Sequence, residues 1–174
     1  MRDKKIKKIT LTALMTALAV VLSFVESLFP TAYFMPPGSK LGLSNIPVMF
    51  SASSFSIGET LLIVVAKSVF VFITRGFTAF CMSLAGGLLS ALCMIVVFRT
   101  TRSFGFAGLG ILSALCHNIG QLAVSFLLVQ TSAVIGYAPV MLITSVVTGI
   151  LTGTLLRSAM PYFSKLTTLK EMEK

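Results

Sequence analysis

A few polar residues lie inside apolar sequence, where they could bind a ligand. His117, Asn118 and Gln121 fall near the centre of an apolar stretch, residues 108–129, that is long enough to span a bilayer. At helical spacing His117 and Gln121 share one face, and Asn118 lies beside them. Because polar groups in hydrocarbon cost free energy unless they find partners, we expect this face to form one wall of a polar cavity.

Lys67 lies near the middle of a second apolar stretch, residues 60–74. A lysine at that depth indicates either an ion pair, for example with Glu26, or contact with an anionic ligand, and both interpretations stay open. A pocket that contains Lys67 and His117 would be positively biased and would suit a phosphate ester or a carboxylate. Three phenylalanines are available for an apolar or aromatic part of such a ligand: Phe70, Phe72 and Phe126.

Residues for catalysis or metal binding are sparse. His117 has no nucleophile or orienting acid near it in the sequence. Asp3 is the only aspartate, and no carboxylate pair could hold the magnesium ions of a prenyl diphosphate. There is no Walker A sequence, and the three cysteines lack zinc-site spacing. We therefore expect no catalytic residue, no metal site, no cofactor and no enzymatic activity of the chain itself.

The composition is that of a membrane protein. Of 174 residues, 56% are hydrophobic and only 11% are charged. The formal net charge is +9, but the basic residues gather at the ends of apolar stretches, where they set topology and meet anionic lipid rather than nucleic acid. This asymmetry predicts a multi-pass protein of the bacterial cytoplasmic membrane, with both termini in the cytoplasm.

The elements that must position the polar residues are helices. We expect an all-α, six-transmembrane-helix bundle over residues 9–160, between a basic N-terminus (1–8) and a C-terminal tail (161–174). The second run, residues 46–57, spans only about 18 Å and cannot cross about 30 Å of hydrocarbon, so an interior position is favoured. Residues 30–45 are expected to form an outer loop able to cover the cavity. The expected segments are residues 9–29, 46–57, 60–74, 79–98, 108–129 and 137–156.

Small residues at fourfold spacing predict close helix packing. Ala13 and Ala17 form one such pair in the first helix. Two longer stripes lie in the fourth and sixth segments: Ala79, Ser83, Gly87 and Ala91, and Ser145, Gly149 and Gly153.

Four short motifs together resemble the Gx transporter family, often labelled heptaprenyl diphosphate synthase component I. They are KLGLSN (40–45), SLAGGLLS (83–90), HNIGQL (117–122) and GxLTG (149–153). This family is similar to the substrate-binding S components of energy-coupling factor (ECF) transporters, and the resemblance covers roughly residues 9–160.

The resemblance implies partners and a site. In S components an alanine motif on the first helix docks on the coupling helices of a transmembrane subunit, which two ATPase subunits drive; here that role falls to Ala13 and Ala17. A substrate pocket is implied near the outer side, covered by the loop between the first two helices. The substrate-binding candidates are Lys40, Asn45, Lys67, His117, Asn118 and Gln121.

The leading hypothesis is an S component of an ECF-type transporter. Its substrate would be a small anionic, cofactor-like molecule such as an isoprenoid phosphate or a flavin. Two alternatives stay open: an accessory membrane subunit (component I) of heptaprenyl diphosphate synthesis, and a stand-alone facilitator.

Overall fold

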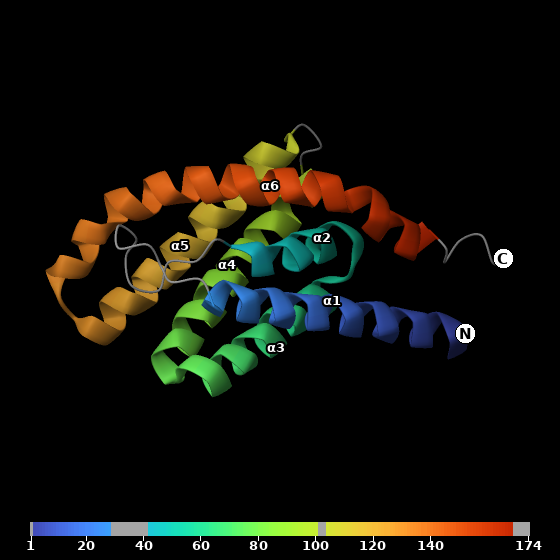
Figure 1. The fold of residues 1–174 in the computed structure, drawn as a ribbon, viewed down its shortest axis with the longest axis horizontal. Coiled ribbons are helices and arrows are strands. Elements are labelled where there is room, and N and C mark those ends of the chain that lie inside the picture. The colour runs from blue at the N-terminus through green and yellow to red at the C-terminus, as the bar shows by residue number, and fades with distance from the viewer. Residues whose placement is uncertain (1, 29–41, 101–103, 169–174) are drawn as a thin grey trace.

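The computed structural model describes residues 2–28, 42–100 and 104–168. These residues form an elongated helical bundle, and no strand occurs among them (Figure 1). The predicted all-α class is confirmed. In chain order the elements are α1 (Arg2–Leu28), the 3₁₀ turn η1 (Leu43–Asn45), α2 (Ile46–Ser54), α3 (Ile57–Arg75), α4 (Phe77–Thr100), α5 (Phe106–Val129), the 3₁₀ turn η2 (Ser132–Tyr137) and α6 (Ala138–Thr168).

Within these ranges, five helices are long and apolar enough to cross a membrane, namely α1, α3, α4, α5 and α6. Of the six expected spanning helices, five are therefore found; the remaining segment forms the short α2, which has 9 residues and is not long enough to be counted among them. Phe55 ends α2 in an extended conformation, and Ser56 caps α3 with help from Glu59. The expected loop at residues 30–45 lies almost wholly outside the described residues.

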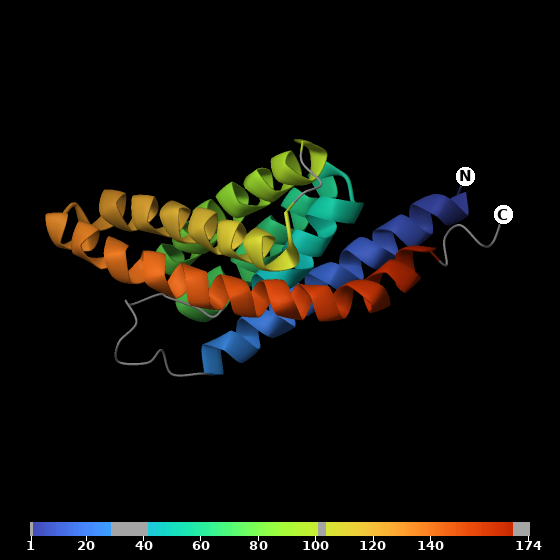
Figure 2. The ribbon, with the colours of Figure 1, turned by 90° about the horizontal axis from the view of Figure 1, so that it is seen from above.

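Although α2 is short, it reverses the chain direction. From α1 the chain returns through α2, and α3 to α6 then alternate in direction, so α1 begins and α6 ends at the same end of the bundle (Figures 1 and 2). Residues Ile46–Ser51 of α2 are buried, which confirms the expected interior position. Met49 and Phe50 each have only 1% of their surface exposed and pack into the main apolar core with Ile63 and Val64 of α3.

Glycines allow the closest helix contacts. A Cβ atom added to Gly149 or Gly153 would collide with the backbone of α5, so the predicted stripe on α6 is a packing surface. The stripe on α4 has the same role, because a Cβ at Gly87 would lie 2.7 Å from Val64 Cγ1 of α3. Gly86, beside it, faces α5 and brings the site helices together.

Candidate functional site

Residues 42–45 form the tight turn that leads into α2. Gly42 has a φ of 80°, a left-handed conformation that favours glycine, and its carbonyl accepts a hydrogen bond from the Asn45 N–H at 2.9 Å. Glu26, near the end of α1, holds the turn: its carboxylate accepts hydrogen bonds from the Leu43 N–H and, at 3.0 Å, from the Ser44 hydroxyl. Glu26 is only 6% exposed, so these bonds offset part of the cost of burying its carboxylate.

Asn45 presents its side chain to α3. Its amide oxygen Oδ1 accepts a hydrogen bond of 2.8 Å from Lys67 Nζ, and Lys67 is only 2% exposed. The sequence left Lys67 with two interpretations, pairing with Glu26 and contact with a ligand. The hydrogen bonds now link Glu26 and Lys67 through the consecutive residues Ser44 and Asn45. Asn45 directly precedes α2, and its side chain binds Lys67 rather than capping the helix.

The contact between α4 and α5 forms another side of the site, next to the turn at residues 42–45 and Lys67 of α3. A Cβ atom at Gly86 would lie 2.6 Å from the His117 carbonyl oxygen, and one at Gly120 would lie 2.8 Å from the Ala85 carbonyl oxygen. Only glycine, whose side chain is a single hydrogen atom, allows the two helices to approach so closely at these positions. The close approach fixes the backbone that carries His117, which is 8% exposed.

Two polar neighbours of His117 connect it to the rest of the bundle. Gln121 Nε2 lies 3.0 Å from His117 Nε2, and Gln121 Oε1 is buried without a hydrogen-bond partner among the described residues. Asn118 reaches α6, where its amide donates to the Ser145 hydroxyl at 2.7 Å and to the Met141 carbonyl at 3.3 Å. Asn118 therefore joins α5 to α6 at the level of the site.

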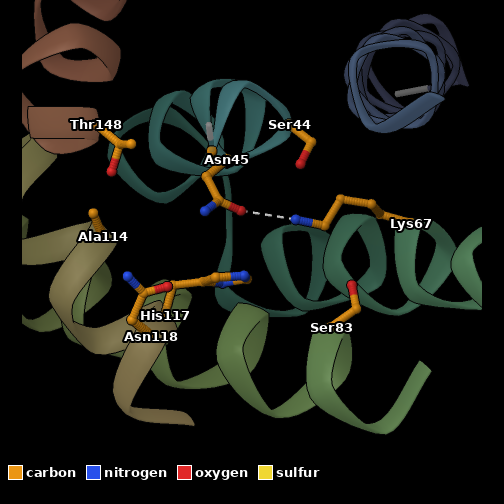
Figure 3. A pocket seen from close by; sticks show the side chains of 9 residues that line it. Ser44, Asn45, Lys67, Ser83, Ala114, His117, Asn118 and Thr148 are labelled. Carbon is orange, nitrogen blue, oxygen red and sulfur yellow. Dashed lines mark hydrogen bonds between the residues drawn. The ribbon is translucent and has the colours of Figure 1, made fainter. Parts of the chain in front are cut away.

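These elements enclose a small polar cavity of about 20 Å³, the space that one water molecule needs (Figure 3). Lys67 reaches in from α3, His117 from α5, and the Asn45 amide points between them (Figure 3). Among the described residues, the lining contains the cation Lys67 and no carboxylate. The lining residues are Gly42, Ser44, Asn45, Lys67, Ser83, Ala114, His117, Asn118 and Thr148.

The structure thus brings Asn45, Lys67, His117 and Asn118 to one cavity, as the interpretation of the sequence required. Gln121 is not among the described lining residues; it contacts the imidazole of His117 instead. The sixth candidate is outside the described residues: Lys40.

Sequence reasoning missed three hydroxyl groups of the lining: Ser44, Ser83 and Thr148. Ser83 was assigned to helix packing because it belongs to a stripe of small residues, and it does lie 3.4 Å from the Ser68 hydroxyl. Thr148 could have been found from the polar face that it forms with Ser145 and Thr152 on α6, all of which are buried.

The phenylalanines expected to contact a ligand do not line this cavity. Phe72 and Phe126 are 48% and 43% exposed on the outer surface of the bundle. Phe70 packs edge-on against Phe24 of α1, with 6.5 Å between ring centroids. Their periodicity placed them on helices but did not show which face each helix turns inward.

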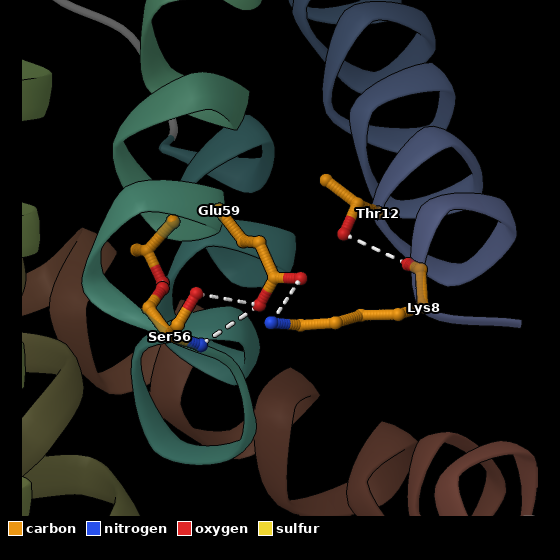
Figure 4. Close-up of polar contacts among 5 residues, drawn as sticks. Lys8, Thr12, Ser56 and Glu59 are labelled. Atoms are coloured by element: carbon orange, nitrogen blue, oxygen red, sulfur yellow. Dashed lines mark hydrogen bonds and ion pairs between the residues drawn. The ribbon is translucent and has the colours of Figure 1, made fainter. Parts of the chain in front are cut away.

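A second feature is an open groove of about 630 Å³ between α1 and α3. Ala13 and Ala17 are exposed and line it together with Ala66 of α3, so small side chains form much of its floor. At one end Lys8 of α1 forms an ion pair of 3.0 Å with Glu59, which also accepts hydrogen bonds from Ser56 at the start of α3 (Figure 4).

Comparison with known proteins supports the resemblance inferred from the motifs. No curated protein and no solved structure matches the chain. The family described as heptaprenyl diphosphate synthase component I matches residues 15–159, which include about half of α1, all of α2 to α5 and most of α6. Every described lining residue of the cavity lies within this range. The chain is therefore a membrane protein that belongs to the heptaprenyl diphosphate synthase component I family.

Proposed function

We propose that this protein is the substrate-binding subunit of an ECF-type, ATP-driven transporter and carries no catalysis of its own. The observation that carries the proposal is the buried ammonium group of Lys67, which faces a polar cavity inside an apolar bundle. A buried cation is costly in a membrane protein, and such residues mark ligand or ion sites. His117 adds an imidazole to the same cavity.

The lining favours an oxyanion as the bound group. Its polar side chains are an ammonium, an imidazole, two amides and three hydroxyls, all of which can donate hydrogen bonds to oxygen. Among the described lining residues there is no phenylalanine or tyrosine to stack on a flavin ring. Of the two substrate classes considered, a phosphate ester such as an isoprenoid phosphate therefore fits better than a flavin.

The groove between α1 and α3 supports the partner assignment. Its alanines, Ala13, Ala17 and Ala66, let the backbone of another helix approach closely, as small residues do in membrane helix pairs. In our proposal a helix of the transmembrane coupling subunit occupies this groove, and two ATPase subunits drive that partner. The alternation of six segments, with α1 beginning and α6 ending at one end, suits a six-helix arrangement in the bacterial cytoplasmic membrane with both termini in the cytoplasm (Figure 2).

The decisive experiment identifies the ligand and the energy source. Native mass spectrometry of the detergent-purified protein is expected to show a copurified small oxyanion that is lost in Lys67→Gln. Uptake of that molecule into proteoliposomes is then expected to require the partner module and ATP. Uptake by this chain alone in ATP-depleted vesicles would mean a facilitator and would reject the proposal.

The name of the family suggests one second candidate, an accessory membrane subunit in diphosphate synthesis. This candidate predicts a different partner, a soluble synthase whose activity depends on the presence of this chain. Affinity purification from membranes separates the two, because one function predicts copurified ATPase subunits and the other a copurified synthase.

A further inference from the structure

We propose that the cavity binds an oxyanion that carries one hydrogen atom, such as the monohydrogen form of a phosphate monoester, and that Asn118 and Thr148 accept a hydrogen bond from that O–H group. The inference rests on the proposed function, because it concerns the group that the same cavity binds. It deepens that proposal by dividing the lining into a side that donates hydrogen bonds and a side that accepts them.

The hydrogen bonds of Asn118 fix which end of its amide is left for a ligand. The Met141 carbonyl has no hydrogen to give, so the Asn118 atom 3.3 Å from it must be the nitrogen. The Ser145 hydroxyl, 2.7 Å from that nitrogen, donates its own hydrogen to the Met141 carbonyl at 2.6 Å and can therefore only accept from Asn118. In Figure 3 the Asn118 nitrogen lies on the side of α6 and the oxygen on the side of His117. Both hydrogen bonds that this side chain makes to described residues use the nitrogen, which leaves the oxygen as the acceptor.

Thr148 of α6 also presents an oxygen whose hydrogen is already engaged. Its hydroxyl donates to the Thr144 carbonyl, one turn earlier in the same helix, at 2.8 Å. A hydroxyl has one hydrogen and two lone pairs, so only the lone pairs remain for a ligand. Thr148 lines the cavity and is 6% exposed, which makes it a buried acceptor.

The side of the cavity formed by α3 and α4 donates. Lys67 Nζ can only donate, so its bond of 2.8 Å engages the Asn45 amide oxygen and leaves the Asn45 nitrogen as a donor. The Ser83 hydroxyl accepts from the Ser68 hydroxyl at 3.4 Å, which leaves the Ser83 hydrogen to donate. Figure 3 shows Lys67 and Ser83 across the cavity from the side of α5 and α6.

An oxyanion without hydrogen suits only the donor side. All its oxygens carry lone pairs, which accept from Lys67 but repel the lone pairs of the Asn118 and Thr148 oxygens. An oxyanion with one O–H group satisfies both sides, since its charged oxygens accept from the donors and its hydrogen is donated to an acceptor.

The same arrangement gives selectivity between anions of similar shape. A site with buried acceptors rejects an analogue that lacks the hydrogen, because the acceptors then lose their partner. A phosphate monoester has this hydrogen in its monohydrogen form. A sulfate monoester and a phosphate diester do not, so the cavity is expected to discriminate against both.

The acceptors keep their character when the cavity widens. Its volume of about 20 Å³ is the space that one water molecule needs, so the lining must move apart before a phosphate group enters. The hydrogen bond of Thr148 lies within α6, and those of Asn118 join α5 to α6. These two helices pack backbone against backbone at Gly149 and Gly153, so they are expected to move together and to keep these bonds.

A matched pair of probes tests the inference on the full chain in a nonionic detergent. Isopentyl phosphate and isopentyl sulfate have the same alkyl chain. At about pH 5 each has mainly one negative charge, because the second pKa of a phosphate monoester is about 6. Only the phosphate then has an O–H group. Isothermal titration calorimetry is expected to show that the phosphate binds about tenfold more tightly, the effect of one hydrogen bond.

Variants show whether the two acceptors cause this preference. Thr148→Val keeps the shape of the side chain and removes one acceptor, and Asn118→Leu removes the other. Each is expected to reduce the ratio of the two dissociation constants severalfold, and the double variant is expected to bring it close to one. Ser83→Ala is the matched control on the donor side: it is expected to weaken both probes and to leave the ratio unchanged. Because the ratio compares two probes on one protein, partial unfolding does not alter it.

Equal affinity of the unaltered protein for the two probes would overturn the inference and leave oxyanion binding intact. A ratio that stays unchanged in both Thr148→Val and Asn118→Leu would also overturn it, since the O–H group would then be bound elsewhere. If neither probe binds, the proposed oxyanion site itself fails, and the inference fails with it.

Discussion

Lys67 Nζ donates a hydrogen bond of 2.8 Å to Asn45 Oδ1, across a cavity in which both side chains are buried. The acceptor is a neutral amide oxygen. An ammonium group binds the oxygen of an anion more strongly than that of an amide, because the former bond is assisted by charge on both sides. In the function we propose, the Asn45 amide oxygen would compete with the oxyanion for one of the three N–H donors of Lys67.

Lys67→Gln is predicted to lower ligand occupancy far more than Asn45→Ala does. Lys67→Gln removes the charge and is expected to weaken binding of the copurified ligand by roughly 10- to 100-fold, the worth of one charge-assisted hydrogen bond. Asn45→Ala removes a competing acceptor of Lys67 and also an amide donor of the lining, two effects that oppose one another, so it is expected to change binding much less. Titration of ligand-stripped protein, followed by native mass spectrometry, measures both effects.

The thermal stability of Lys67→Gln provides the control for this prediction. Glutamine can still donate to Asn45, and it removes a buried charge, so Lys67→Gln is expected to keep or raise the melting temperature. A large loss of stability, with ligand occupancy unchanged in the protein that stays folded, would show that Lys67 is a structural residue.

His117 is predicted to contribute through its imidazole, and Gln121 through support of that ring. His117→Ala removes a lining group and is expected to lower ligand affinity by about tenfold, as for one lost hydrogen bond. Gln121→Ala leaves the lining intact and is expected to have a smaller effect, because Gln121 contacts His117 at 3.0 Å and is not among the described lining residues. An equal or larger loss in Gln121→Ala would place Gln121 in direct contact with the ligand.

Gly86→Ala is predicted to destabilise the site by steric overlap. The added Cβ would lie 2.6 Å from the His117 carbonyl oxygen, a backbone atom that cannot move without shifting α5. Overpacking of this kind costs about 1–3 kcal/mol, which a thermal unfolding curve in detergent resolves. We expect ligand occupancy to fall with stability, because the shift displaces His117.

Gly58→Ala provides the matched control for this prediction. No heavy atom lies within 4 Å of a Cβ built at Gly58, which is in the first turn of α3. The same chemical change there is expected to be neutral or slightly stabilising, because it restricts the unfolded chain. If Gly86→Ala unfolds at the same temperature as Gly58→Ala, the close contact between α4 and α5 is not required.

The sequence predicted the depth of the polar groups better than their partners. Lys67 and His117 lie near the middle of apolar stretches. Because polar groups are energetically costly in hydrocarbon, two such groups at the same depth in one small bundle are expected to face a shared polar cavity. That inference needed only the positions of the stretches. The interior position of α2 followed from its short length.

The partner of Glu26 could not be predicted, since its carboxylate binds a backbone N–H and a hydroxyl of a turn rather than a cation. The periodicity of one helix also does not show which neighbour each face meets. For this reason Ser83 was assigned to packing although it also lines the cavity, and Phe72 was expected near the ligand although it is half exposed on the surface.

Ala13→Leu combined with Ala17→Leu is predicted to spare ligand binding and to block transport. Both alanines line the groove between α1 and α3, and neither lines the cavity that contains Lys67. Leucine would fill the floor of the groove and keep a partner helix several ångströms from α1, which removes the close packing that small residues allow. Native mass spectrometry measures ligand occupancy, and ATP-dependent uptake in proteoliposomes that contain the partner module measures transport.

Ala123→Leu is the matched control, because Ala123 is an exposed alanine of α5 outside this groove. The same increase in side-chain volume there is expected to leave both occupancy and uptake unchanged. If the double variant transports as well as Ala123→Leu, the partner does not dock in this groove. If it loses ligand and transport together, the groove and the cavity are not independent, and α1 contributes to binding as well as to docking.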